Sequence, residues 1–263
     1  MMPENLLFGT YQEAFDACDK GYENNDLVEM VFAKTLNYSR SIKTGLSQGI
    51  DLSSLKHLVG LLKSIKNNQL KVIDFGGACG ANYFLLKAFL GDNISLQWHV
   101  VETPAMVEKS RSLEDGCLKF FINIDDAVKD LEDLDLVFAS GSLPYCPNPY
   151  ETLEKLVACG AKNLFITQTA LHSGDKDIVT IQKSRIIANG PGPAPRGLKD
   201  GYIEYPLTFC SKAKIENILK TNYEIDVTLV ENESGKQAFI RTHPFLESSQ
   251  YPASAFGYLC TTK

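Results

Sequence analysis

The sequence predicts an α/β protein with a mostly parallel sheet of seven strands. Short apolar runs begin near residue 70 and recur along the chain, and segments with the helical spacing of apolar residues separate them. Strands that alternate with helices of this length form parallel sheets with helices on both faces. Residues 11–66 show only the helical spacing, so we expect a helical layer before the sheet.

Each expected element has its own pattern. The clearest N-terminal helix, in residues 53–66, places Leu55, Leu58 and Leu62 on one face. Strands are expected where apolar residues run together, at residues 70–75, 96–102, 118–124, 134–140, 163–170, 223–231 and 256–262. Helices are expected at residues 82–90, 104–113, 124–131, 149–160 and 211–221.

The change of pattern near residue 68 divides the chain into two parts. Residues 1–68 are the expected N-terminal helical cap, and residues 69–263 are the expected sheet-containing domain. Within the second part, residues 183–206 are rich in glycine, proline and charge, and they interrupt the alternation. A connection of about twenty residues is long for a compact domain, so we expect a functional loop there.

Composition and charge exclude several classes of function. The chain has 26 Lys and Arg against 32 Asp and Glu, and this net charge of −6 argues against binding to nucleic acid or to an anionic membrane. The cysteines are scattered singly, without a C-x-x-C pair or a histidine at ligand spacing, so neither disulfides nor a metal site is expected. The N-terminus lacks the pattern of a signal peptide, and no apolar run approaches membrane-spanning length. We therefore expect a cytoplasmic protein without membrane insertion.

The first expected strand runs into a glycine-rich turn, VIDFGGACG, at residues 72–80. Asp74, Gly76, Ala78 and Gly80 give this turn the spacing D-x-G-x-A-x-G. Ligands of open α/β sheets bind beyond the carboxyl ends of the strands, where this turn should lie. The carboxylate of Asp74 disfavours a phosphate at the turn and favours an ammonium group.

Glu102 closes the second expected strand, where an acidic side chain can accept hydrogen bonds from both hydroxyls of a ribose. An ammonium group, a ribose and no phosphate describe S-adenosylmethionine, so we expect this cofactor, with S-adenosylhomocysteine as its product. The alternative for the turn is a tight structural corner in which Gly76 and Gly80 only allow close packing. The alternative for Asp74 and Glu102 is a surface carboxylate or a helix cap.

The stretch from Asp74 to Glu102 resembles motif I and the second acidic position of class I S-adenosylmethionine-dependent methyltransferases. A further resemblance, to a bacterial family of methyltransferases found in capsule and O-antigen gene clusters, covers residues 9–31, 72–84, 96–102 and 134–149. Motif I of that family usually reads D-F-G-G-S-x-G, whereas this chain has Ala78 in place of the serine. The family's S-S-V-L-Q-Y is present as SGSLPY at residues 140–145, with Pro144 in place of glutamine.

This resemblance implies a Rossmann-like class I methyltransferase fold and methyl transfer to a small surface-polysaccharide or capsule precursor. The methylated atom would be a sugar hydroxyl or a phosphate-type oxygen, and the precursor could be nucleotide-linked. The expected cofactor-binding residues are Asp74, Gly76, Gly77, Gly80, Glu102, Asn123, Asp125 and Ser140. Asn123 or Asp125 would meet the adenine, because the third strand should end there. The alternative is that Asp125 or Asp126 caps the following helix.

Methyl transfer to an alcohol needs a base, whereas transfer to an ionised oxygen depends mainly on positioning. His172 is the first candidate for the base because it lies near the carboxyl end of an expected strand. Tyr145 is the second candidate. The alternatives are an ordinary loop histidine and a tyrosine that only shields the cofactor.

Arg185, Arg196 and His243 are the candidates for acceptor binding. Together with Lys183 and Lys199, the two arginines could hold an anionic small-molecule acceptor while the loop closes as a lid. The alternative is a solvated, charged loop.

Two other functions remain open. One is a nicotinamide-dependent oxidoreductase on a Rossmann fold, which Asp74 before the turn disfavours. The other is a binding module that holds S-adenosylmethionine without catalysis. The sequence leaves the oligomeric state open, and a homodimer is compatible with it.

Overall fold

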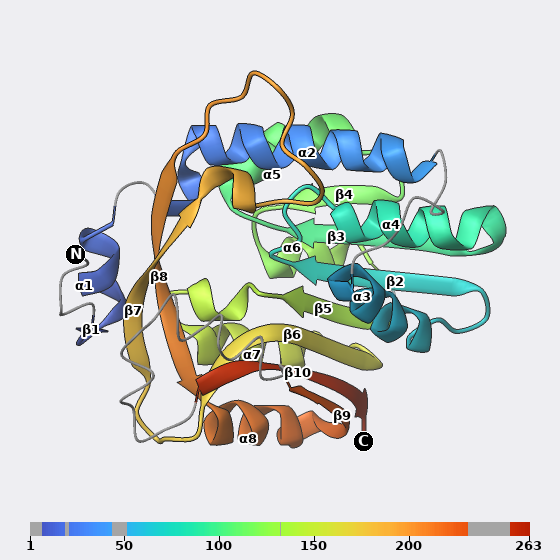
Figure 1. Ribbon diagram of the computed structural model, residues 1–263. Coiled ribbons are helices and arrows are strands. Elements are labelled where there is room, and N and C mark those ends of the chain that lie inside the picture. The colour runs from blue at the N-terminus through green and yellow to red at the C-terminus, as the bar shows by residue number, and fades with distance from the viewer. Residues whose placement is uncertain (1–6, 19–20, 44–51, 132, 231–252) are drawn as a thin grey trace.

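The computed structural model describes residues 7–18, 21–43, 52–131, 133–230 and 253–263. Figure 1 shows a central twisted sheet with helices on both of its faces. None of the helices in these ranges is both long enough and apolar enough to cross a lipid bilayer.

Seven strands form the main sheet, in the spatial order β4-β3-β2-β5-β6-β10-β9. Their bounds are β2 Gln69–Phe75, β3 Ser95–Val101, β4 Leu118–Phe121, β5 Leu136–Ser140, β6 Asn163–His172, β9 Tyr223–Val230 and β10 Ala253–Thr262. The first five strands of this order are parallel, and β10 is antiparallel to both β6 and β9. The predicted α/β fold with a mostly parallel central sheet is therefore confirmed, but the strand count differs, because the complete sheet of the described residues has ten strands and not seven.

An antiparallel extension of the sheet takes up the two ends of the expected loop at residues 183–206. The strands β7 (Ile178–Arg185) and β8 (Tyr202–Ser211) pair along their length, and β1 (Leu7–Phe8) pairs with β7. The end of β8 also pairs with the end of β6, so the extension continues the main sheet. The expectation of an irregular loop was wrong for both ends of the segment, because the connection between the strands covers only residues 186–201.

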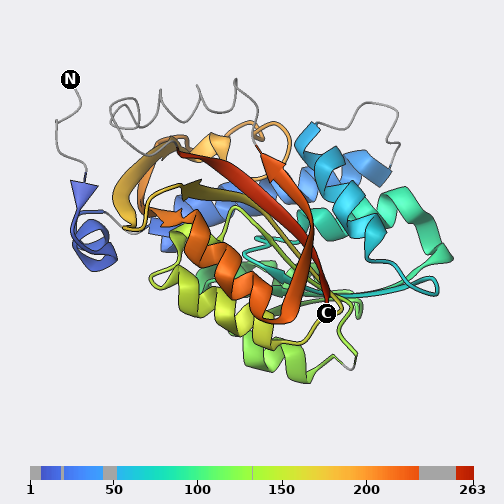
Figure 2. The ribbon, with the colours of Figure 1, turned by 90° about the horizontal axis from the view of Figure 1, so that it is seen from below.

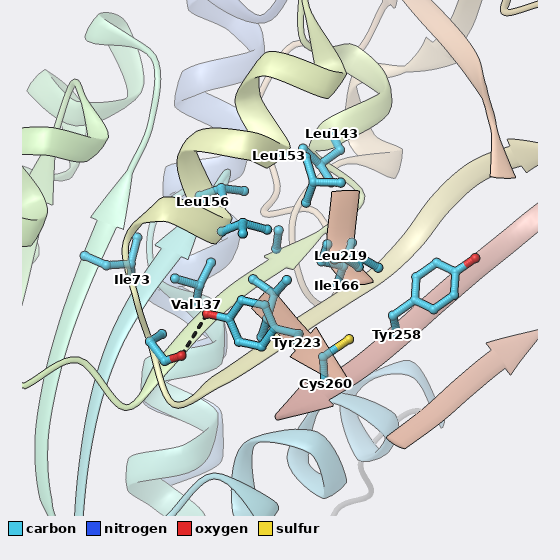
Figure 3. Packing of buried hydrophobic residues seen from close by; sticks show 14 of the residues in the cluster. Ile73, Val137, Leu143, Leu153, Leu156, Ile166, Leu219, Tyr223, Tyr258 and Cys260 are labelled. Carbon is cyan, nitrogen blue, oxygen red and sulfur yellow. Dashed lines mark hydrogen bonds between the residues drawn. The ribbon is translucent and has the colours of Figure 1, made fainter. Parts of the chain in front are cut away.

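One face of the sheet carries three helices, α6 (Ile124–Lys129), α7 (Pro149–Ala158) and α8 (Lys212–Asn222). In Figure 3, Leu153, Leu156 and Leu219 from these helices pack toward Ile73 and Val137 of the sheet. The hydroxyl of Tyr223 donates a hydrogen bond of 2.7 Å to the carbonyl of Ala161 and so satisfies the polar end of a buried ring.

The opposite face carries α3 (Leu52–Lys63), α4 (Ala81–Leu90) and α5 (Pro104–Ser110), with α2 (Asn25–Lys43) packed on α4 and α5. The view in Figure 2 separates this group from α7 and α8 on the other side of the sheet. Val72 and Phe138 point toward this face, while their neighbours Ile73 and Val137 point to the other. This alternation is that of strands buried on both sides. The short helix α1 (Tyr11–Asp16) lies beside the β7/β8 extension.

Candidate functional site

The glycine-rich turn joins β2 to α4 in an unusual backbone conformation. Gly76, Ala78 and Gly80 all have positive φ angles, of 70°, 50° and 76°. A Cβ atom on Gly76 would lie 2.3 Å from Ser142 Cβ, and one on Gly77 would lie 2.4 Å from Asp74 Cγ. Glycine is thus required at position 76 both by the backbone and by the space around it.

Asp74 lies behind the turn. Its side chain is buried and accepts a hydrogen bond of 2.9 Å from Trp98 Nε1. Burial raises the pKa of Asp74 to about 7, although the hydrogen bond from the indole opposes this shift. Asp74 does not line the neighbouring cavity, and its carboxyl group lies directly against Gly77 of the turn.

Glu102 directly follows β3 and faces the turn. Its Oε1 accepts a hydrogen bond of 3.0 Å from the Ala78 amide, and its Oε2 accepts one of 2.7 Å from the Thr103 amide. Burial raises the pKa of this carboxyl above its usual range, while the two backbone donors lower it. Glu102 therefore joins the glycine-rich turn to the end of β3.

A cavity of about 320 Å³ opens at the carboxyl ends of β2, β3 and β5. Its lining residues are Tyr22, Phe75, Gly76, Val101, Glu102, Thr103, Pro104, Ile122, Gly141, Ser142, Tyr145 and Cys146. Thr103 Oγ1 and Ser142 Oγ are buried and have no hydrogen-bond partner among the described residues. Because an unmade hydrogen bond of a buried hydroxyl is unfavourable, these two groups are candidates for a hydrogen bond to a ligand.

Three tyrosines form an aromatic cluster at one side of this cavity. Tyr22 stacks on Tyr205 with ring centroids 4.6 Å apart, and Tyr145 meets both rings edge-on at 5.6 and 5.2 Å. The Tyr145 hydroxyl donates to Gln182 Oε1 at 2.9 Å, and burial raises the pKa of this phenol. Tyr145 therefore stays protonated at neutral pH and is a wall residue and hydrogen-bond donor. The structure does not favour it as the expected base.

The other expected base, His172, is not among the residues that line the cavity. Its ring is buried at the end of β6, and its Nδ1 accepts a hydrogen bond of 3.0 Å from the Gly174 amide. Burial also lowers the pKa of this imidazole. His172 is absent from the lining of the cavity, because β6 continues up to this residue and pairs there with β8. We therefore do not assign it a catalytic role.

Of the residues expected near the adenine, Asn123 has a structural role of its own. Asn123 caps α6, since its Oδ1 accepts from the Asp126 amide at 2.9 Å and its Nδ2 donates to the Asp126 carboxylate at 2.8 Å. Asp125 is exposed and does not line the cavity, whereas the preceding Ile122 does. The alternative prediction was that Asp125 or Asp126 caps this helix. The helix does have a cap, but Asn123 provides the hydrogen-bond acceptor.

Ser140 is also engaged elsewhere. Its hydroxyl lies 3.0 Å from Nε2 of His57, and the next two residues, Gly141 and Ser142, line the cavity in its place.

The cations expected to hold an anionic acceptor are mostly paired with acids. Lys183 contacts Glu204 at 2.7 Å, Lys199 contacts Asp26 at 3.5 Å, and the Arg185 guanidinium pairs with Asp200. Arg196 is exposed on the connection between β7 and β8. None of these four cations lines the cavity. His243 lies outside the described residues.

Comparisons with known proteins support the fold. No family model and no curated protein matches the chain. Among solved structures, the N-terminal domain of EvdMO1, crystallised in the presence of S-adenosylhomocysteine and D-fucose, is 11% identical over 82% of this chain and 85% of that one, with a TM-score of 0.51. An O-methyltransferase of a Brevibacillus brevis polyketide synthase, in complex with S-adenosylhomocysteine, is 13% identical over 80% and 71%, with a TM-score of 0.51.

A third neighbour is the [4+2]-cyclase SpnF, which is 11% identical over 96% of both chains, with a TM-score of 0.51. None of the comparisons points to the surface-polysaccharide family that the sequence motifs resemble. At these identities the matches establish architecture alone. Together with the strand order of the main sheet, they show that this chain has the Rossmann-like fold of class I S-adenosylmethionine-dependent methyltransferases.

Proposed function

We propose that the protein is an S-adenosylmethionine-dependent methyltransferase that methylates an oxygen atom of a small acceptor. The observation that carries the proposal is the cavity at the carboxyl ends of β2, β3 and β5, where the glycine turn and the Glu102 carboxylate meet. In this fold that edge of the sheet is where a nucleoside ligand binds.

The residues present suit this cofactor. Glu102 offers acceptor oxygens for the ribose hydroxyls, and the hydroxyls of Thr103 and Ser142 offer further hydrogen bonds. No Lys, Arg or His lines the cavity among the described residues, which suits a ligand that carries a sulfonium and an ammonium group. Two fold neighbours were crystallised with S-adenosylhomocysteine, the product of such a cofactor.

The bound cofactor would supply a methyl group that is already activated by its sulfonium. The contribution of the chain is then to hold the acceptor oxygen in line with that methyl group and to exclude water. Tyr22 and Tyr145 form the side of the cavity available to an acceptor, and both rings are held in place by Tyr205. Positioning by these rings is the chemistry that the described residues support best.

The lining also bears on the class of acceptor. With Glu102 as its charged member and tyrosines on one side, the cavity favours an uncharged hydroxyl compound over the anionic acceptor expected from the loop cations. Tyrosine rings suit sugar-like rings, which present both C–H groups and hydroxyls. A surface-polysaccharide precursor fits this class, and its support is the sequence resemblance at residues 134–149.

Two other functions are compatible with the fold. A nicotinamide-dependent oxidoreductase would also use an acidic residue at the end of the second strand, but the carboxyl group of Asp74 before the turn disfavours a pyrophosphate there. A module that binds the cofactor without catalysis would share every contact named above. The match to a cyclase shows why the reaction must be measured directly.

Titration calorimetry on the purified protein tests the proposal. We expect S-adenosylmethionine and S-adenosylhomocysteine to bind with micromolar affinity and NAD not to bind. The variant Glu102→Gln should lose this affinity, because its amide group cannot accept the second backbone hydrogen bond or both ribose hydroxyls. The matched control is Glu224→Gln, the same change at an exposed position on β9.

Methyl-labelled cofactor then distinguishes an enzyme from a binding module. Transfer should be measured to uncharged sugars and to the matching phosphorylated sugars. Transfer to the uncharged set supports the proposal, and transfer only to the phosphorylated set rejects the uncharged acceptor. Tight cofactor binding without transfer to either set would favour the binding module. Binding of NAD alone, or of none of the three ligands, would reject the cofactor assignment.

A further inference from the structure

His57, on α3, bridges two segments beside the cavity. Its Nδ1 lies 3.1 Å from Asn82 Oδ1 at the start of α4, and its Nε2 lies 3.0 Å from Ser140 Oγ at the end of β5. Because a carboxamide oxygen only accepts, Nδ1 donates to Asn82 and Nε2 accepts from the Ser140 hydroxyl. The ring is buried and packs edge-on against Phe138, with centroids 5.4 Å apart.

Both partners of His57 lead directly into the wall of the cavity. Asn82 is the second residue of α4 and follows the glycine turn, whose Gly76 lines the cavity. Ser140 precedes Gly141 and Ser142, which line the cavity as well. The same two segments also touch each other, since a Cβ atom on Gly76 would lie 2.3 Å from Ser142 Cβ. His57 therefore joins the two segments at a second point.

The helix that carries His57 is firmly seated on the sheet. A Cβ atom on Gly60 would lie 2.2 Å from Phe165 Cε1, so the backbone of α3 packs directly on this ring. Leu58 and Leu61 of the same helix are fully buried in the cluster that contains Phe138 and Phe165. Such packing gives the imidazole a fixed position relative to both segments.

We propose that His57 is a positioning residue of the cofactor site. Its imidazole sets the spacing between the glycine turn with the start of α4 and the segment after β5, and so sets the shape of the cavity between them. His57 does not line the cavity and has no part in the transfer itself. The cofactor role rests on the proposed function, whereas the bracing of the two segments can be measured without any ligand.

A set of variants separates this role from general stabilisation. His57→Leu fills the space without hydrogen bonds, His57→Asn keeps a donor near Nδ1, and His57→Gln keeps a polar group near Nε2. The control Leu61→Val trims the buried face of the same helix at a residue of the cluster that contains Phe138 and Phe165. Calorimetric titration with S-adenosylhomocysteine and thermal unfolding are measured for each variant.

We expect His57→Leu to weaken binding about tenfold, because the two segments that line the cavity lose the two hydrogen bonds that fix their spacing. Either His57→Asn or His57→Gln should recover part of the affinity. Leu61→Val should lower the Tm and leave the affinity unchanged. Unchanged affinity in His57→Leu, or an equal loss in Leu61→Val, would overturn the positioning role.

Amide hydrogen exchange of the protein without ligand gives the independent test. We expect faster exchange at residues 77–82 and 140–145 in His57→Leu, and no such change in Leu61→Val. If the wild-type protein binds no S-adenosylhomocysteine, the proposed function fails, and the exchange data still decide whether His57 braces the segments. Equal exchange in wild type and His57→Leu would reject the brace.

Discussion

Replacing Gly76 by alanine should damage both the fold and the cavity. Gly76 has a φ angle of 70°, and the new Cβ would lie 2.3 Å from Ser142 Cβ and 3.1 Å from its Oγ. The left-handed backbone costs an alanine about 1 kcal/mol, and forced overpacking adds roughly 1–3 kcal/mol. The clash can be relieved only if the turn and the segment after β5 move apart, which changes the cavity between them.

Gly160→Ala is the matched control for this change. Gly160 has a φ angle of 69°, and no described atom lies within 4 Å of the position that its Cβ would occupy. This variant should therefore lose only the backbone contribution of about 1 kcal/mol.

Urea unfolding and titration with S-adenosylhomocysteine measure both effects. We expect Gly76→Ala to lose about 2–4 kcal/mol of unfolding free energy and at least about tenfold in affinity, while Gly160→Ala keeps wild-type affinity. Equal stability losses in the two variants, with normal binding by Gly76→Ala, would refute the close approach of the turn to Ser142.

Three other changes test further parts of the site. Burial raises the pKa of Asp74 from 3.8 to about 7, so the unfolded chain releases this proton at a lower pH than the folded chain does. The free energy of unfolding should therefore fall between about pH 4 and pH 7 and then level off. Asp74→Asn should reduce that fall in urea unfolding at about pH 5 and pH 7.5 and leave the part that comes from Glu102, whose pKa burial also raises; a variant that keeps the whole fall would show that Asp74 is not responsible. Thr103→Val removes a buried hydroxyl that has no hydrogen-bond partner among the described residues. The Tm should therefore stay equal or rise, while affinity for S-adenosylhomocysteine falls. A clear drop in Tm would mean that the hydroxyl is hydrogen-bonded in the free protein. Arg185→Ala breaks the exposed ion pair with Asp200, so the Tm should change little and cofactor affinity should stay unchanged. Weaker cofactor binding by this variant would place the hairpin nearer the cavity than it lies here.

The main sheet could be predicted because its strands carry their own apolar runs between turn residues. Val72 and Ile73 are both fully buried although they face opposite sides, as expected for a parallel strand covered by two layers of helices. The strand β8 was harder to predict, because it follows a stretch rich in glycine and proline. Its first four residues nevertheless alternate, with Ile203 and Tyr205 buried and Tyr202 and Glu204 more exposed. A search for period-two patterns inside the expected loop would have found it.

The part of the site that would bind the cofactor could be predicted from the sequence, because the glycine turn and Glu102 lie at the ends of adjacent strands. Tyr22 and His57 had no local signal, since they reach the site only through the packing of the N-terminal segments. His172 illustrates the opposite problem. A histidine near the end of a strand can face either the cavity or a neighbouring strand, and the pairing of β6 with β8 decides this only in the folded protein.

A crystal structure of the protein with S-adenosylhomocysteine would test the central claim most directly. We expect the ribose hydroxyls within hydrogen-bonding distance of the Glu102 carboxylate and the homocysteine part beside Gly76, with Tyr145 and Ser142 near the sulfur. A ligand bound at any other place, or a cavity that stays empty at saturating concentration, would contradict the assignment of this cavity as the cofactor site.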